Sequence, residues 1–295
     1  MSTNIRCCPV CNGTFEESGK VVVRGKYNVS VVTCLKCGFT TFPHVCWLDE
    51  AYANAITPSD IGYVNRNISW SGIVSRLYVY HELPIANYVD YGSGYGMFVR
   101  LMRDNGYHFH SYEPYCKNLF AQYTTASTER FGNYECLTAF EVFEHLSDIN
   151  ESFQEMLGFS DCILFSTDLI STPIPSFDSW SYYGFEHGQH ISFWTQEALG
   201  IMAIRHGLKY TQLNWISPSW HLIAPKDHPL HHPIKRPSFY ERVLRRLGRK
   251  KNIPESLLLK DAAKIVEREK CFYSGMVVPD RWHLDDDFSQ AKKQT

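Results

Sequence analysis

Four cysteines occur in two pairs near the start of the chain, Cys8 with Cys11 and Cys34 with Cys37, and 22 residues separate the pairs. A pair of cysteines with two residues between them forms a knuckle that supplies two thiolates to a tetrahedral metal site. The spacing therefore predicts a structural zinc ion held by these four side chains, with Cys7 as an alternative to Cys8. Four thiolates leave no open coordination position, so we do not expect this zinc to be catalytic.

A second set of residues combines three glycines with one acid. Gly92, Gly94 and Gly96 follow a short apolar stretch, and Glu113 lies 21 positions after the first glycine. Glycines permit a sharp turn and let a ligand approach the backbone closely. A carboxylate at this spacing is expected beside the ribose hydroxyls of a nucleoside held over the turn. A dinucleotide site would need a third glycine where Met97 stands, so the pattern favours another class of nucleoside ligand.

A third set lies in the stretch from residue 180 to residue 194, which is dense in aromatic residues and histidine. Glu186, His187 and His190 stand together here, just before a helix that Thr195 is expected to cap. Loops of this kind carry binding residues, and a neutral imidazole accepts a proton at neutral pH. We therefore predict that His187 or His190 is a general base, with Glu186 beside it.

The sequence DYGSGYG, in which Asp90 precedes the three glycines, resembles the first motif of class I S-adenosylmethionine-dependent methyltransferases. In that family the glycine turn passes under the methionine part of the cofactor, and the acid after the second strand holds the ribose. The resemblance implies cofactor-binding roles for Asp90, Gly92, Gly94, Gly96 and Glu113.

A second motif, LTAFEVFEHLSD at residues 137–148, resembles the segment after the fourth strand of the same family, which lies beside the cofactor. The resemblance covers roughly residues 60–225 and implies that Phe140 and Glu141 border the cofactor. Enzymes that methylate the amino groups of nucleic-acid bases often carry an Asn/Asp-Pro-Pro-Tyr/Phe element after this strand. No such element stands here, so methylation of bases is disfavoured.

The same motif also suggests a cation site. Some O-methyltransferases of quinol and RNA 3′-end substrates hold a divalent metal with a Glu-x-x-Glu-His pattern and a later histidine. The resemblance implies that Glu141, Glu144, His145 and His190 could hold magnesium or manganese here, and it makes His145 a further catalytic candidate. Such an ion would orient an acceptor hydroxyl and lower its pKa.

The aromatic loop resembles that of methyltransferases acting on sugars in bacterial glycan or antibiotic pathways, some of which also carry an N-terminal zinc module. We therefore predict O-methylation of a sugar in a nucleotide-sugar, surface-glycan or secondary-metabolite pathway. Three alternatives stay open: C-methylation of a sugar, cation-assisted O-methylation of another small molecule, and a non-catalytic protein that binds the cofactor or a partner. The sugar C-methyltransferases are longer by a C-terminal domain, which weighs against the first alternative.

Short apolar segments alternate with helical patterns from residue 85 onward. Helices are expected after Gly96, from Asp148 to Leu157, and after Thr195. The expected strands are Ile85–Tyr91, His108–Tyr112, Ala121–Ala126, Glu135–Phe140, Cys162–Thr167, Leu208–Asn214 and Trp220–Ala224. This order predicts an α/β fold with a doubly wound, mostly parallel seven-stranded sheet.

Four segments are expected along the chain: a zinc ribbon at 1–45, a helical lead-in over the cofactor cleft at 46–84, a cofactor-binding core at 85–225, and a basic helical tail at 226–295. A second helix of the tail is expected from 254 to 272. The tail is predicted to be weakly attracted to anionic surfaces through its cluster of basic residues. The members of this cluster are Lys235, Arg236, Arg242, Arg245, Arg246, Arg249, Lys250 and Lys251.

The composition is typical of a globular protein, with 44% hydrophobic and 20% charged residues among 295. No apolar run approaches the length of about 20 residues that crosses a bilayer. The N-terminus lacks an apolar signal core, so a cytoplasmic location is predicted. Ten cysteines then indicate metal binding or burial rather than disulfides. A net charge of −2 argues against nucleic acid as a partner, and the oligomeric state stays open.

Overall fold

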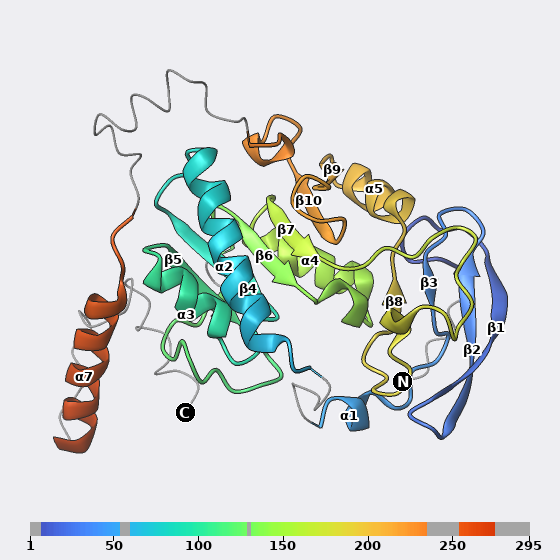
Figure 1. The fold of residues 1–295 in the computed structure, drawn as a ribbon, viewed down its shortest axis with the longest axis horizontal. Helices are drawn as coiled ribbons and strands as arrows, with labels where there is room; N and C mark the ends of the chain where they lie inside the picture. Colours follow the sequence, from blue (N-terminus) through green and yellow to red (C-terminus); the bar gives the residue numbers. More distant parts are fainter. Residues whose placement is uncertain (1–6, 54–59, 129–130, 235–253, 275–295) are drawn as a thin grey trace. The chain divides into compact units, whose positions relative to one another are not determined.

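The computed structural model describes residues 7–53, 60–128, 131–234 and 254–274 (Figure 1). The chain divides into two compact units: the first comprises residues 1–61 and 136–233, and the second comprises residues 62–135 and 234–295. These boundaries differ from the four predicted segments. The first unit joins the N-terminal cysteine segment to the later half of the predicted core, and the second joins the glycine turn to the C-terminal helix.

The second unit contains one pair of parallel strands, β4 (Asn87–Tyr91) and β5 (His108–Tyr112). Helix α2 (Tyr63–Tyr80) and helix α3 (Met97–Asp104) belong to the same unit. The ring of Tyr88 stacks on Phe109 at a centroid distance of 5.2 Å and on Tyr78 at 4.7 Å. Tyr88 and Phe109 are register partners, so these rings lie on one face of the strand pair and exclude water from it.

The C-terminal helix α7 (Leu258–Ser274) is attached to α3 within the second unit. The buried guanidinium of Arg103 donates to both carboxylate oxygens of Asp261, at 2.8 and 2.9 Å, and Arg100 donates to the same carboxylate at 2.7 Å. Leu257 also donates its backbone N–H to the carbonyl of Arg103 at 3.0 Å. The predicted tail helix is thus confirmed, whereas the basic cluster between residues 235 and 251 lies outside the described residues.

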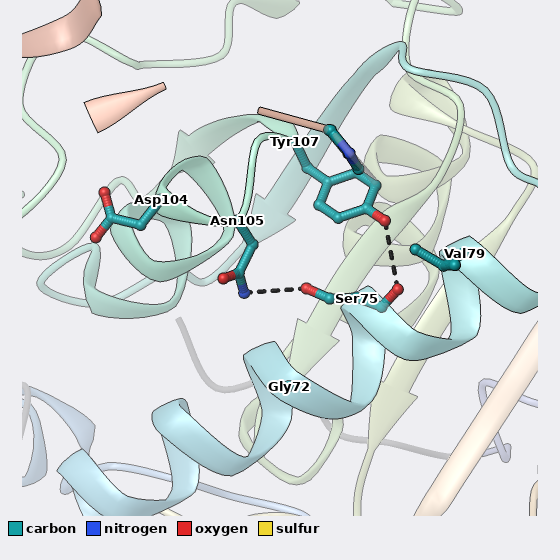
Figure 2. A pocket seen from close by; sticks show the side chains of 7 residues that line it. Gly72, Ser75, Val79, Asp104, Asn105 and Tyr107 are labelled. Atoms are coloured by element: carbon teal, nitrogen blue, oxygen red, sulfur yellow. Dashed lines mark hydrogen bonds between the residues drawn. The ribbon is translucent and has the colours of Figure 1, made fainter. Parts of the chain in front are cut away.

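A cavity of about 340 Å³ lies in the second unit, where α2 faces the end of α3 (Figure 2). Asn105 donates to the hydroxyl of Ser75 at 3.0 Å, and the hydroxyl of Tyr107 donates to the carbonyl of Ser75 at 3.3 Å. Pro254 completes its lining, so the cavity belongs to the region where the C-terminal segment is attached.

The first unit contains the other core strands. Strand β6 (Leu137–Phe140) runs parallel to β7 (Ile163–Ser166), and helix α4 (Ile149–Phe159) connects them. Strand β10 (Trp220–Ala224) pairs antiparallel with β7, and β9 (Lys209–Gln212) pairs antiparallel with β10. The predicted closing pair of strands is therefore confirmed, and so is the α/β class.

The predicted strand Ala121–Ala126 is wrong, because only a single bridge joins Ser111 to Thr125 in this segment. The side chain of Asn118 accepts from the N–H of Ala121 and donates to its carbonyl, both at 2.8 Å. Side-chain hydrogen bonds of this kind satisfy the backbone in a turn and compete with an extended strand. The described α/β strands therefore number six rather than the predicted seven.

A smaller antiparallel sheet in the first unit has the order β1 (Phe15–Val23), β2 (Tyr27–Cys34), β3 (Thr40–Thr41), β8 (Ser192–Phe193) (Figure 1). Strands β1 and β2 form an antiparallel hairpin, but it is not a separate module. Its sheet includes β8, which lies more than 150 residues later in the chain. The short helix α1 (Leu48–Ala51) follows, and Trp47 is fully buried beside the sheet.

Two helix starts are capped by side chains, at Thr195 as predicted and also at Asp148. The side chain of Asp148 accepts from the N–H of Glu151 at the start of α4, and Thr195 accepts from Ala198 at the start of α5 (Gln196–Arg205). Such caps satisfy backbone donors that the first helical turn leaves unpaired. None of the helices in the described ranges is long and apolar enough to cross a membrane.

Candidate functional site

The glycine turn after β4 has the geometry that its sequence predicts. Gly92, Gly94 and Gly96 all adopt positive φ angles, of 68°, 54° and 82°. The N–H of Gly94 donates to one carboxylate oxygen of Glu113 at 2.9 Å, and the N–H of Tyr115 donates to the other at 2.8 Å. The predicted pairing of the turn with the acid after β5 is thus present. Each oxygen of Glu113 keeps a second lone pair for a ligand hydroxyl.

Two further observations describe the surroundings of this turn. A Cβ atom at Gly96 would clash with the side chain of Asn118, and one at Gly94 would lie 3.8 Å from the hydroxyl of Tyr63. Burial raises the pKa of Glu113, and the hydrogen bonds that it accepts from backbone amides oppose this shift. Asp90 is buried, with 4% of its surface exposed, at the end of β4.

The first unit brings together a group of titratable side chains. Glu144, His145 and His190 each offer a ligand atom, and these atoms all lie within 4.8 Å of one another. Glu144 and His145 stand on the 3-10 helix η2 (Phe143–His145), and His190 lies two residues before β8. The rings of His145 and His190 have centroids 5.0 Å apart. Two of the predicted catalytic residues are therefore neighbours.

The hydrogen bond of His190 defines which of its nitrogens is free. Its Nδ1 lies 2.6 Å from the backbone carbonyl of Tyr182. A carbonyl only accepts, so Nδ1 carries the proton and Nε2 keeps a lone pair. Burial and the neighbouring His145 lower the pKa of His190 to about 3, which leaves the ring neutral at physiological pH.

His145 is held in a similar way. Its Nδ1 lies 3.0 Å from the carbonyl of Gln189 and 2.9 Å from the hydroxyl of Tyr52. Burial lowers the pKa of His145 to about 4, so this ring is neutral as well. The group therefore combines two neutral imidazoles, each with a lone pair on Nε2.

His187 and Glu186 are placed differently. The Nδ1 of His187 accepts a hydrogen bond from the N–H of Gln189 at 3.1 Å, and the ring packs so closely on Gly184 that a Cβ there would clash with it. Its acceptor nitrogen is thus occupied by the backbone. Glu186 is exposed on the same loop. The structure therefore distinguishes His190 from its two predicted partners.

The two acids of the Glu-x-x-Glu-His pattern do not share one helical face. Glu141 has a positive φ of 54°, and its Oε1 accepts from the hydroxyl of Ser166 at 2.6 Å. Glu144 is fully buried, and among the described residues neither of its oxygens has a hydrogen-bond partner. Burial raises the pKa of Glu144 well above its usual value, and the charge of Glu141 adds to the shift. Glu141 and Glu144 therefore do not begin one α-helix, because the backbone turns at Glu141.

Phe140 is the last residue of β6 and lies in the first unit, in contact with the ring of Trp220 at a centroid distance of 4.9 Å. Its predicted contact with a cofactor stays a prediction.

The four predicted zinc ligands form a compact group. Their sulfur atoms all lie within 4.8 Å of one another, with Cys8 and Cys37 3.6 Å apart and Cys11 and Cys34 3.4 Å apart. Tetrahedral coordination with zinc–sulfur bonds of about 2.3 Å places sulfurs at about this separation. The side chain of Cys7 is exposed and outside the group. These residues therefore fit a structural zinc ion, with Cys8 rather than Cys7 as the ligand.

Several residues of the site carried no signal in the sequence. Tyr52, Ser166 and Arg24 contact the titratable side chains or the loop that carries them. Their partners lie 93, 25 and 163 positions away, so no local spacing marks them. In contrast, Gly92, Gly94, Gly96 and Glu113 belong to one strand–helix–strand unit, so their spacing can be seen in the sequence.

An α/β fold with a glycine turn after one strand and an acid after the next defines a nucleoside-binding class of protein. A family model described as "Methyltransferase domain" matches residues 65–213, half of the chain, and the protein belongs to this family. The predicted methyltransferase domain is thereby confirmed.

Solved structures include several methyltransferases that are distantly similar to this chain. Human N-acetylserotonin methyltransferase in complex with SAM is 9% identical over 61% of this chain and 65% of its own, with a TM-score of 0.38. Magnesium protoporphyrin IX methyltransferase from Synechocystis with bound SAH is 10% identical over 61% and 95%, with a TM-score of 0.37. Phosphoethanolamine N-methyltransferase 2 of Haemonchus contortus is 12% identical over 63% and 62%, with a TM-score of 0.42. The chain thus spans less than two thirds of the first and third of these proteins. A search of curated protein sequences found no match.

Proposed function

We propose that this protein transfers a methyl group from S-adenosylmethionine to a hydroxyl of a sugar. The observation that carries this proposal is the neutral His190, whose Nδ1–H is bonded to a carbonyl and whose Nε2 is left with a lone pair. Methyl transfer to a hydroxyl releases one proton, and an oriented neutral imidazole is suited to accept it. The membership of the methyltransferase family supplies the reaction class.

The donor is assigned to the glycine turn. Glu113 is oriented by the amides of Gly94 and Tyr115, and its free lone pairs are suited to the two hydroxyls of a ribose. Positive φ angles at Gly92, Gly94 and Gly96 leave the backbone of the turn without side chains. When bound, S-adenosylmethionine supplies an electrophilic methyl group on a positively charged sulfur.

The acceptor is assigned to the surroundings of His190. The substrate hydroxyl loses its proton to Nε2 of His190 as its oxygen gains the methyl group. The positive charge that begins on the donor therefore ends on the imidazole, so the total charge of the reacting groups does not change. Proton removal of this kind contributes about 10²- to 10⁴-fold to the rate.

A sugar is favoured as acceptor over a nucleic acid because the chain has a net charge of −2 and the histidines belong to an aromatic loop. The experiment that tests the proposal is mass spectrometry of reactions with nucleoside-diphosphate sugars and glycan intermediates. The expected product is heavier by one CH₂ group and forms only with S-adenosylmethionine. Methylation of RNA oligonucleotides but of no sugar would contradict the proposal.

A second candidate is cation-assisted O-methylation. One observation favours it: the buried oxygens of Glu144 lack a hydrogen-bond partner among the described residues, and they lie near nitrogens of His145 and His190. Two imidazoles and one carboxylate suit manganese better than magnesium. Glu141, predicted as a further ligand, is instead bonded to Ser166.

A chelator separates the two candidates. If a divalent cation assists, activity falls in chelator and returns with manganese while the zinc content of the protein is unchanged. Full activity in chelator at unchanged zinc content would contradict this second candidate.

A further inference from the structure

The hairpin of β1 and β2 joins the cysteine group to the loop that carries His190. Phe15, at the start of β1, pairs with Cys34, so the open end of the hairpin lies at the cysteines. Its tip is the turn after Val23, which is paired with Tyr27. Nine residues of strand span roughly 30 Å. Residues 184–191, which include His187 and His190, form the histidine loop.

The tip of the hairpin holds the histidine loop by its backbone. The N–H of Arg24 donates to the carbonyl of Phe185 at 2.7 Å, and its guanidinium Nη1 donates to the carbonyl of His187 at 2.8 Å. Gly188, with a φ of 68°, fits so closely here that a Cβ would lie 3.0 Å or less from the side chains of Val23, Arg24 and Trp47. The loop and the hairpin tip are thus in direct contact on both sides of His187.

Residues just beyond the hairpin hold the rest of the loop. The indole N–H of Trp47 donates to the carbonyl of Gly188 at 2.7 Å, and the hydroxyl of Thr41 donates to that of Ile191 at 2.7 Å. The side chain of Gln189 in turn donates to the carbonyl of Ala51 at 2.8 Å. These bonds leave the backbone on either side of His190 with little freedom.

The cysteine end of the hairpin is attached to α5 and to β8. Arg205 donates to the carbonyls of Pro9 and Val10, at 2.9 and 2.8 Å, and Thr195 donates to the carbonyl of Cys37. Strand β3 pairs with β8 through Thr40 and Phe193. The hairpin is therefore fixed at both ends, and a metal at the cysteines closes the end opposite the histidine loop.

We propose that the N-terminal hairpin is a positioning device for the histidine loop, and that Arg24 is a positioning residue for His190. This inference rests on the proposed function, in which His190 removes the acceptor proton. The cysteine site then affects the acceptor step rather than the binding of the donor, because Arg24 donates to the histidine loop, whereas Glu113 is held by the amides of Gly94 and Tyr115. A shift of about 1 Å in a reacting group can lower a rate by about 100-fold.

The test compares Arg24→Met with the matched control Lys26→Met in the full-length zinc-loaded protein. Both side chains pair with Glu50, Arg24 at 3.8 Å and Lys26 at 2.7 Å. Of the two, Arg24 alone donates a side-chain hydrogen bond to the histidine loop, to the carbonyl of His187. The first readout is the NMR spectrum of the histidine rings, which needs no acceptor. The second is methyl transfer to the nucleoside-diphosphate sugar that gains one CH₂ group.

Arg24→Met is expected to shift the ring resonances of His187 and His190 while those of His221 stay in place. It should lower kcat by at least about 10-fold, with the affinity for S-adenosylhomocysteine unchanged. Lys26→Met should change neither the spectrum nor kcat. Removal of zinc with a strong chelator, followed in the same spectrum, should move the same two rings before donor affinity is lost.

Unchanged His187 and His190 resonances in Arg24→Met would overturn the inference, and so would an unchanged kcat despite shifted resonances. The proposed function is tested separately by His190→Gln. If that variant is inactive while Arg24→Met behaves as the control, the positioning role fails and the proposed function stands. If His190→Gln keeps full activity, the proposed function itself fails.

Discussion

At the scale of single residues, hydrogen bonds distinguish His190, the proposed general base, from His187, whose ring is bonded to the backbone. His190 gives its Nδ1–H to the carbonyl of Tyr182 and keeps Nε2 free, whereas the Nδ1 of His187 is occupied by the N–H of Gln189. Sequence spacing alone treats these histidines as equivalent. Their roles differ because the backbone fixes a different tautomer for each ring.

Replacing His190 with glutamine is expected to lower kcat by about 100-fold or more, because the amide cannot accept the acceptor proton. His187→Gln keeps an acceptor for the N–H of Gln189 and should lower kcat by less than about 10-fold. Steady-state methyl transfer to the identified acceptor measures both, and S-adenosylhomocysteine affinity serves as the control. Equal losses in the two variants would contradict the assignment of His190 as the base.

His221 supplies a test of pH-dependent stability away from the reacting groups. It is fully buried on β10, with Nε2 2.9 Å from the carbonyl of Thr167 and Nδ1 3.0 Å from the hydroxyl of Tyr210. Burial lowers the pKa of His221 to about 4. The unfolded chain binds a proton near pH 6.5 and the folded chain does not, so stability is lost as the pH falls from 6.5 toward 4.

Between pH 7 and pH 5.5 this loss amounts to about 1 kcal/mol for one histidine. His221→Gln removes the titrating group, so its free energy of unfolding should fall about 1 kcal/mol less than that of the wild type over the same interval. Urea unfolding at the two pH values measures the difference. The same pH dependence in both proteins would show that His221 is not the group responsible.

At the scale of elements, the C-terminal helix α7 is secured by one buried ion pair. Arg103 and Asp261 have 1% and 3% of their surfaces exposed. Burial raises the pKa of Asp261, but the hydrogen bonds and charges of Arg103 and Arg100 outweigh burial and leave the pKa below its usual value. The carboxylate is therefore charged at neutral pH.

Removing one partner of a buried ion pair leaves the other charge uncompensated, at a cost of about 3 to 5 kcal/mol. Asp261→Asn should therefore increase hydrogen exchange of the α7 amides and lower the free energy of unfolding by about 3 kcal/mol. The matched control is Asp104→Asn, which also loses a bond to Arg100, at 2.9 Å, but one that is partly exposed. That control should cost less than about 1 kcal/mol. Similar effects of the two variants would argue against the role of the buried pair.

At the scale of the whole molecule, local sequence patterns predicted most elements. The knuckle spacing of the cysteines, the cap at Thr195 and the strand–turn–helix around Gly94 each arise from neighbouring residues, and the structure has them all. The segment near Asn118 was mistaken, because its side chain forms a turn where β-formers suggested a strand.

The parts that the sequence did not reveal are contacts between distant segments. Arg24 is hydrogen-bonded to the carbonyl of His187, which lies 163 positions later in the sequence. Tyr52 is hydrogen-bonded to His145, which lies 93 positions later. Such contacts depend on how β3 pairs with β8, and a two-residue strand has no periodicity that a sequence pattern can show. The acceptor site was for this reason predicted less completely than the glycine turn.

The measurement that tests the central claim most directly is calorimetric titration of S-adenosylhomocysteine into the wild type, Glu113→Gln and the control Glu255→Gln. Glu113→Gln replaces one acceptor oxygen with an NH₂ group that cannot accept from a ribose hydroxyl or a backbone amide. S-adenosylhomocysteine is expected to bind the wild type and Glu255→Gln, and to bind Glu113→Gln at least about 10-fold more weakly. Equal affinity in all three proteins, or no binding to the wild type, would contradict it.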